Sequence, residues 1–167
     1  LVKEPGTLEP TPWHHDQPYY PVDGDQILSR WLPLYPVPRE ICVEYVKGSH
    51  RWGRWFQPRF FRNATDLAVA DPRFEPVPDI AAERGRYDLL GWDLAPGDCI
   101  AFHGLALHGA PGNVSLTRRR RAYSTRWLGA DTRYAARLGQ ISPPIVDHGL
   151  APGDPMECAL FPRVWPR

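Results

Sequence analysis

The sequence APGDCIAFHGLALHGAPGN, residues 95–113, places two short apolar runs between tight turns. The turn residues stand at 95–98 and 111–113, and the apolar runs CIAFHG and ALHGA lie between them. Short runs bounded by Pro, Gly, Asp and Asn are typical of neighbouring β-strands. This stretch therefore predicts two strands, with His108 at a strand end immediately before a turn.

The rest of the chain repeats this pattern of strand and turn. The runs at 26–37, 41–46 and 114–129 mix β-branched, aromatic and polar residues in partial alternation, which predicts further strands. Residues 62–86, interrupted by prolines, predict an irregular insertion. Helix is indicated only by DIAAERG at 79–85 and YAARLG at 134–139. Many short strands and few short helices predict one all-β-dominated domain over residues 1–167, a sandwich or a jelly roll in place of a βαβ fold.

Composition narrows the function classes. The 167 residues are 43% hydrophobic and 23% charged, which fits a packed core and excludes a disordered chain. The net charge of +1 argues against a nucleic-acid partner, although Lys3 and Lys47 are the only lysines among 20 basic residues. No apolar run is long enough to span a membrane, and the first residues lack a signal-peptide layout, so a cytoplasmic protein is expected.

The densest group of ligand-type side chains is Trp13-His14-His15-Asp16. In extended chain, residues two apart point to the same face, so His14 and Asp16 project together while His15 points away. This pair predicts a two-residue arm for a metal ion.

A third ligand has to come from another segment, and His108 at its strand end is the leading candidate, with His103 as the rival. Two histidines and one carboxylate form the facial triad of non-haem Fe(II) oxygenases, which leaves metal positions open for cosubstrate and oxygen. Catalytic zinc sites use the same ligand types, so the triad alone leaves the metal open.

An arginine run follows on the long strand, Arg118-Arg119-Arg120-Arg121. Alternation sends Arg119 and Arg121 to one face and Arg118 and Arg120 to the other. A buried guanidinium needs an anionic partner, and arginine offers a planar two-donor fork that suits the far carboxylate of 2-oxoglutarate.

Three segments in this order resemble the phytanoyl-CoA dioxygenase family: WHHD at 13–16, EYVKGSHRWG at 44–53, and residues 95–113 followed by RRRA at 119–122. That family consists of oxygenases that depend on Fe(II) and 2-oxoglutarate and are built on a double-stranded β-helix, a cupin-like jelly roll. The resemblance covers about residues 11–127, and the joint order of the segments is far more specific than any one of them. It implies hydroxylation of an unactivated C–H bond in a small organic substrate, with O2 consumed and succinate and CO2 released.

The resemblance also implies roles for single residues. His14, Asp16 and His108 correspond to the iron ligands, Arg119 to the residue that holds the distal carboxylate of 2-oxoglutarate, and Trp31 to a lining residue of the cosubstrate pocket. Aspartate at position 16 favours hydroxylation over halogenation, because related halogenases have a small residue there. From the residues themselves, Arg120 is the alternative anchor, because a one-residue bulge would reverse the register of the arginine run.

An aromatic-rich stretch follows residue 51 and offers an apolar wall or lid over a substrate. The residues expected to contribute are Trp52, Trp55, Phe56, Phe60 and Phe61. The equal alternative is a satellite hydrophobic cluster under a loop.

Two departures from the family pattern motivate an alternative function. Ala110 stands where some members have a serine that helps to bind 2-oxoglutarate, and the portion that precedes the HxD arm in relatives is absent, so the chain is expected to lack the N-terminal part of a longer protein. The alternatives are a non-catalytic jelly-roll module with a vestigial metal site, and a cupin-type enzyme that works without 2-oxoglutarate. The identity of the substrate and the oligomeric state stay open.

Overall fold

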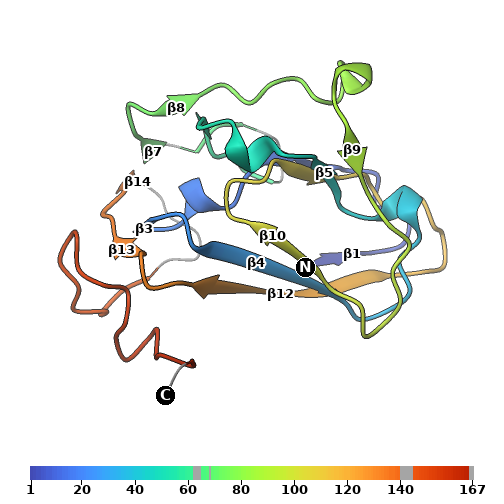
Figure 1. Cartoon of the computed structure of the whole chain (residues 1–167). Helices are drawn as coiled ribbons and strands as arrows, with labels where there is room; N and C mark the ends of the chain where they lie inside the picture. Colours follow the sequence, from blue (N-terminus) through green and yellow to red (C-terminus); the bar gives the residue numbers. More distant parts are fainter. Residues whose placement is uncertain (62–64, 68, 140–144, 166–167) are drawn as a thin grey trace.

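The computed structural model describes residues 1–61, 65–67, 69–139 and 145–165. This part of the chain is mostly antiparallel β-structure, and its helices are 3-10 turns of three residues each (Figure 1). The prediction of an all-β-dominated jelly roll is confirmed. None of the helices described here is long or apolar enough to cross a membrane.

The described residues form fourteen strands, most of them short. They are β1 (Val2–Lys3), β2 (Thr11–His14), β3 (Val22–Asp23), β4 (Ile27–Pro33), β5 (Glu44–Val46), β6 (Trp55–Phe56), β7 (Val69–Ala70), β8 (Phe74–Glu75), β9 (Leu89–Leu90), β10 (Ile100–His103), β11 (His108–Ala110), β12 (Arg120–Leu128), β13 (Arg133–Tyr134) and β14 (Leu138–Gly139). The 3-10 turns are η1 (Gln17–Tyr19), η2 (Arg39–Ile41), η3 (Ser49–Arg51) and η4 (Arg84–Arg86).

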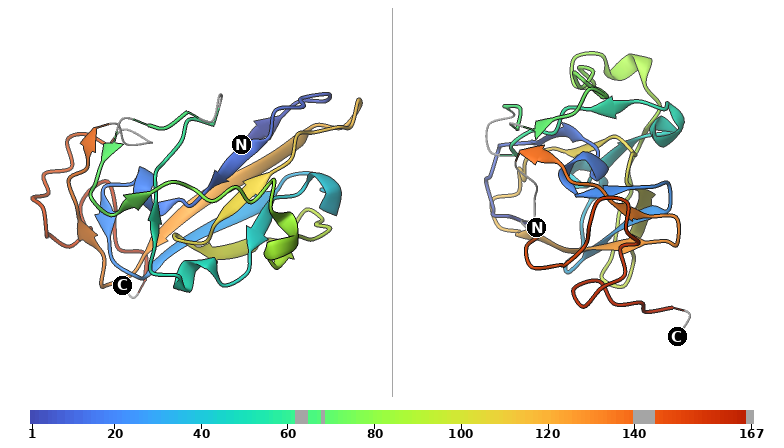
Figure 2. Two further views of the ribbon diagram at one scale, coloured as in Figure 1. Left: turned by 90° about the horizontal axis from the view of Figure 1, so that it is seen from above. Right: turned by 90° about the vertical axis from the view of Figure 1, so that its left-hand side faces the viewer.

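Two four-stranded sheets form the body of the molecule, in the orders β1-β12-β4-β10 and β2-β11-β5-β9 (Figures 1 and 2). Neighbouring strands within each sheet are antiparallel. One hydrophobic cluster joins the sheets, because it contains Trp31 from β4 and Ala122 from β12 together with Tyr45 from β5 and Ala110 from β11. The site described below lies between these layers.

Strands β4 and β12 form the longest pairing, in which Trp31 lies opposite Ser124 and Ser29 opposite Arg126. Along β4 the even-numbered residues are more exposed than the odd-numbered ones, and Ser29 is fully buried. This alternation is the period-two pattern that the sequence shows. It turns Ser29 and Trp31 toward the interior.

The helical predictions at 79–85 and 134–139 were wrong. The first segment consists of turns that end in η4, and Ile80 at its centre is buried in a hydrophobic cluster. In the second, Arg133 and Tyr134 pair with β3, and Leu138 and Gly139 pair with β7. Tertiary strand pairing therefore outweighs the weak helix propensity of these short segments.

The long strand predicted at 114–129 begins only at Arg120. The side-chain amide of the buried Asn113 donates to the carbonyl oxygens of Lys3, Glu4 and Arg118. These bonds hold the residues between Asn113 and Arg120 as a loop. Within the irregular insertion predicted at 62–86, residues 62–64 and 68 lie outside the described residues, and the described part contains the two-residue strands β7 and β8.

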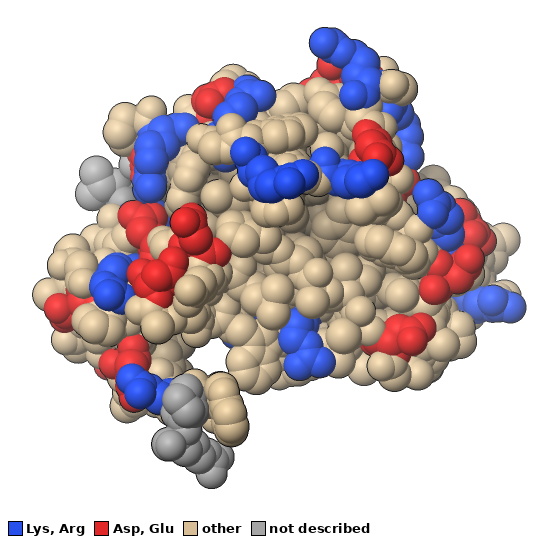
Figure 3. Space-filling view, in the orientation of Figure 1, with Lys and Arg blue, Asp and Glu red and all other residues tan. Residues whose placement is uncertain are grey.

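Charges of both signs are interspersed on the face shown in Figure 3, chiefly near its edges. Exposed ion pairs among the described residues include Lys47 with Asp88 and Arg54 with Glu75. This distribution agrees with the near-zero net charge of the sequence.

The turn between β11 and β12 depends on Gly112. A Cβ atom added there would lie 2.7 Å from the carbonyl oxygen of Thr7 and closer still to that of Leu8. Both obstacles are backbone, so they cannot be relieved by a side-chain rotation. The segment before β2 therefore packs directly onto this turn.

We expect Gly112→Ala to destabilise the protein by about 1–3 kcal/mol through overpacking. For a chain of this size, that loss lowers Tm by roughly 3–10 °C. The control is Gly85→Ala, since a Cβ at Gly85 meets no atom within 4 Å. Thermal unfolding followed by circular dichroism checks the pair, and equal Tm values for the two variants would contradict the close packing at Gly112.

Candidate metal centre

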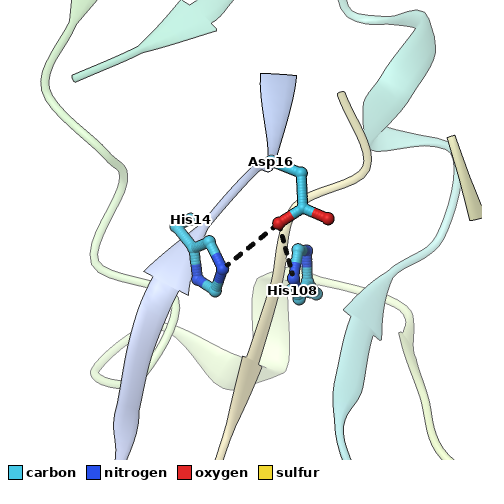
Figure 4. A group of neighbouring side chains, drawn as sticks. All are labelled: His14, Asp16 and His108. Carbon is cyan, nitrogen blue, oxygen red and sulfur yellow. Dashed lines mark ion pairs between the residues drawn. The ribbon is translucent and has the colours of Figure 1, made fainter. Parts of the chain in front are cut away.

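Three buried side chains converge between the two large sheets. His14 is the last residue of β2, Asp16 follows it, and His108 is the first residue of β11, directly opposite His14. The Oδ1 atom of Asp16 lies 3.8 Å from Nε2 of His14 and 3.8 Å from Nε2 of His108 (Figure 4). Their ligand atoms all lie within 4.8 Å of one another. The facial triad predicted from the sequence is present.

Backbone carbonyls orient both imidazole rings. Nδ1 of His14 donates to the carbonyl oxygen of Pro12 at 2.8 Å, and Nδ1 of His108 donates to that of Ala106 at 2.9 Å. A hydrogen on Nδ1 leaves the lone pair on Nε2. Both Nε2 atoms are thus prepared to bind a metal ion on the side where Asp16 lies.

The two oxygens of the Asp16 carboxylate have different contacts. Its Oδ2 atom accepts a hydrogen bond from Ser29 Oγ at 2.5 Å and lies 3.4 Å from Nη2 of Arg126. Oδ1 is the oxygen that faces the two histidines. Asp16 is therefore arranged to give a metal one oxygen while the other is held by protein groups.

The electrostatics of the site favour its metal-binding protonation state. Burial lowers the pKa of His14 to about 3 and also lowers the pKa of His108. Burial alone would raise the pKa of Asp16, but the neighbouring His108, Arg126 and His14 bring it below its usual range. At neutral pH the site therefore combines two neutral imidazoles with an ionised carboxylate, the forms that bind divalent metals.

The other nearby histidines point elsewhere. His15 accepts a hydrogen bond at Nε2 from the backbone N–H of Phe56, at 2.8 Å. His103, the rival ligand, uses Nε2 on the carbonyl oxygen of Asp25 and Nδ1 on the N–H of Leu105. Neither belongs to the described metal-ligating group.

The family model described as phytanoyl-CoA dioxygenase (PhyH) matches residues 1–122. The chain belongs to the phytanoyl-CoA dioxygenase family. No curated protein matches it. The family is one of Fe- and 2-oxoglutarate-dependent oxygenases, and the His-Asp-His triad agrees with this membership.

Solved structures share the fold. The non-haem α-ketoglutarate-dependent carbocyclase SnoK from nogalamycin biosynthesis is 30% identical with a TM-score of 0.66, over 97% of this chain and 58% of SnoK. The epimerase SnoN, solved with Fe3+, α-ketoglutarate and nogalamycin RO, is 24% identical with a TM-score of 0.69, over 96% of this chain and 60% of SnoN. EvdO2 from Micromonospora carbonacea var. aurantiaca, complexed with 2-oxoglutarate, is 20% identical with a TM-score of 0.52, over 97% and 55%. This chain therefore covers less than two thirds of the length of each of these three structures.

The arginine run lies partly inside and partly outside the body of this family member. Arg119 is exposed, and its Nε lies 2.5 Å from Oε2 of Glu4. Arg120 is buried, and its Nη1 donates to the carbonyl oxygen of Ile41. Burial lowers the pKa of the Arg120 guanidinium. The inward arginine is therefore Arg120.

Trp31 is buried in the cluster that joins the two sheets, as expected for an interior position. The aromatic residues expected to form a substrate wall do not all lie together. Trp52 stacks edge-on against Phe56, Phe56 is buried in a second cluster, and Trp55 stacks with Phe74. None of these three residues lines the cavity described next.

A cavity of about 740 Å³ reaches Asp16. Tyr19, Phe60 and Phe61 line it from the first half of the chain, and Arg126 and Phe161 from the second half. The centroid of the Phe61 ring lies 4.5 Å from that of His14. Sequence patterns pointed to Phe60 and Phe61, but Arg126 and the C-terminal residues carry no motif, and only the folded chain brings them to the site.

The contacts of the triad predict how strongly two substitutions weaken the binding of a metal ion. Ser29→Ala removes the shortest contact to Oδ2 of Asp16 and should weaken Co(II) binding by about 10–100-fold, as is usual for groups that orient a metal ligand. His108→Ala removes a ligand and should weaken binding further. Calorimetric titration of the metal-free protein measures both.

The matched control is His103→Ala, which we expect to keep the affinity of the unmodified protein. If His103→Ala weakened Co(II) binding as strongly as His108→Ala, the assignment of the third ligand to His108 would fail.

Proposed function

We propose that this chain is the metal-binding part of an enzyme that uses Fe(II), 2-oxoglutarate and O2 to hydroxylate an unactivated C–H bond of a small organic substrate. The observation that carries the proposal is the buried triad of His14, Asp16 and His108, in its metal-binding protonation state, at the end of a cavity of about 740 Å³. Because the chain spans 58% of SnoK, the activity of the whole protein belongs to the proposal.

Two buried polar groups support binding of 2-oxoglutarate. Arg120 is 7% exposed, and no carboxylate in the described part of the chain pairs with it. A buried guanidinium without an anion is costly, so the site favours an anionic ligand. We therefore assign Arg120, in place of Arg119, as the anchor for the distal carboxylate.

Tyr45 supplies the second group. Its hydroxyl is buried with no hydrogen-bond partner among the described residues, and its ring stacks on His108 with centroids 5.5 Å apart. Burial raises the pKa of this phenol, so the hydroxyl keeps its proton and can donate a hydrogen bond. Tyr45 can therefore provide the hydrogen bond that Ala110 cannot.

Iron together with 2-oxoglutarate supplies the oxidant when bound: the cosubstrate becomes succinate and CO2, one oxygen atom of O2 enters succinate, and the other enters the product. The residues of this chain position the reactants and exclude water. Phe61 and Tyr19 form an apolar edge beside His14, with ring centroids 4.5 and 5.8 Å from it. Such an edge keeps solvent away from the metal while the substrate is held.

Arg120→Met should raise KM for 2-oxoglutarate by about 10–100-fold, because a charge-assisted hydrogen bond is worth roughly 1.5–3 kcal/mol. Tyr45→Phe should raise it by a smaller factor. The measurement is succinate released by the iron-loaded, full-length protein. Arg119→Met is the neighbouring control and should stay within about twofold of the unmodified protein, since its guanidinium pairs with Glu4 on the surface.

Two results would count against this assignment. An unchanged KM in Arg120→Met would return the anchor to Arg119 or another residue. Failure of anaerobic, iron-loaded protein to bind 2-oxoglutarate in a calorimeter would instead favour a non-catalytic module or an enzyme that works without this cosubstrate.

Ring closure is a second candidate reaction, because SnoK, the 30% identical structure, is a carbocyclase. Both reactions begin with loss of hydrogen from carbon. They differ in whether oxygen returns to that carbon or the carbon forms a bond within the substrate.

Mass spectrometry of the products formed from nogalamycin RO, the ligand of the SnoN structure, and from other small organic substrates distinguishes the two outcomes. We expect a product that has gained one oxygen atom, labelled when the reaction runs under 18O2. A product that has lost two hydrogens and contains no label would exclude hydroxylation, and NMR of that product would then separate ring closure from desaturation. An isomer of unchanged mass would indicate epimerisation. His108→Ala is the inactive control in each case.

A further inference from the structure

The cavity beside Asp16 is lined mostly by apolar side chains, and among its described lining residues the arginines are Arg59 and Arg126. The proposed function makes this cavity the place where substrate meets the metal, and the inference below rests on that function for its biological meaning. A charged group on an apolar wall restricts which molecules can bind, because it must be satisfied when water leaves.

Three contacts hold the Arg126 side chain in place. Its Nε donates to the hydroxyl of Tyr20 at 2.5 Å, and its Nη1 donates to the hydroxyl of Ser124 at 2.5 Å. Its Nη2 lies 3.4 Å from Oδ2 of Asp16. A guanidinium has five N–H donors, so these contacts leave two for a ligand. The side chain is 32% exposed, which leaves it accessible from the cavity.

Within the described residues, no carboxylate pairs with Arg126 alone. Asp16, its acidic partner, also faces His14 and His108, and a divalent ion on that triad would draw on the same negative charge. Arg59 differs, because its Nε lies 3.3 Å from Oδ1 of Asp66. Of the two arginines, Arg126 is therefore the one with positive charge left for a ligand.

We propose that Arg126 determines substrate specificity by binding an acidic oxygen, a carboxylate or an acidic phenol, on an otherwise apolar aromatic substrate. The planar guanidinium offers paired donors to such a group, while Phe60, Phe61 and Phe161 contact its rings. Because Arg126 also touches Asp16, a substrate held there has its neighbouring carbons next to the metal site. Arg126 lies beyond residues 1–122, the span of the family match, so the match assigns it no role.

A pair of fluorescent probes tests the proposal: anthracene-2-carboxylate and its neutral analogue, anthracene-2-carboxamide. The titrations use Zn(II)-loaded protein with 2-oxoglutarate in excess, because Zn(II) draws on the charge of Asp16 while 2-oxoglutarate occupies the metal positions that would otherwise bind the carboxylate. We expect the unmodified protein to bind the carboxylate about tenfold or more tightly than the carboxamide, since one charge-assisted pair is worth roughly 1.5–3 kcal/mol. Arg126→Gln should abolish the preference while still binding the carboxamide, which reports an intact cavity.

Arg59→Gln is the matched control and should keep the preference of the unmodified protein. If Arg126→Gln lost both probes, Arg126→Lys would decide, because a retained preference supports the proposal and a lost one overturns it. The proposal also fails if the unmodified protein does not favour the carboxylate or if Arg126→Gln still favours it. These titrations need no turnover, so their failure is distinct from an absence of succinate release.

Discussion

The pairing of β2 with β11 is the constraint on which the site depends. It sets His14 directly opposite His108 and brings two residues that are far apart in sequence to adjacent positions on one sheet. Gly109, next in the strand, allows this close approach, because a Cβ there would lie 3.0 Å from the Trp13 ring and 3.2 Å from the Thr11 carbonyl oxygen. A side chain at that position would push the two histidines apart.

The local pattern of the sequence predicted the main strands and the HxD arm, and the resemblance to the family implied His108 over His103 as the third ligand. Period-two alternation marks β4 and β12, and the HxD arm together with a histidine before a turn marks the metal ligands. What the pattern could not give was register. The arginine run reads equally well in both phases, and only the Asn113 loop, which delays β12 until residue 120, turns Arg120 inward and leaves Arg119 with Glu4.

The walls of the cavity were beyond sequence reasoning for a different reason. Residues such as Met156 and Phe161 lie in a proline-rich segment without periodicity, and they reach the cavity only through contacts with distant parts of the chain. Long-range packing of this kind leaves no local signature. The metal ligands come from segments inside the family match, whereas much of the wall comes from residues beyond it.

Strand β12 carries both arginines for which a ligand is proposed. Arg120 and Arg126 are six residues apart on its inner face, which corresponds to about 20 Å of extended chain. Arg126 contacts the metal ligand Asp16. Because side chains alternate along a strand, a one-residue insertion near its start would shift both arginines to the outer face relative to β4. With the roles proposed for Arg120 and Arg126, a change in the length of this strand would alter cosubstrate affinity and substrate choice together.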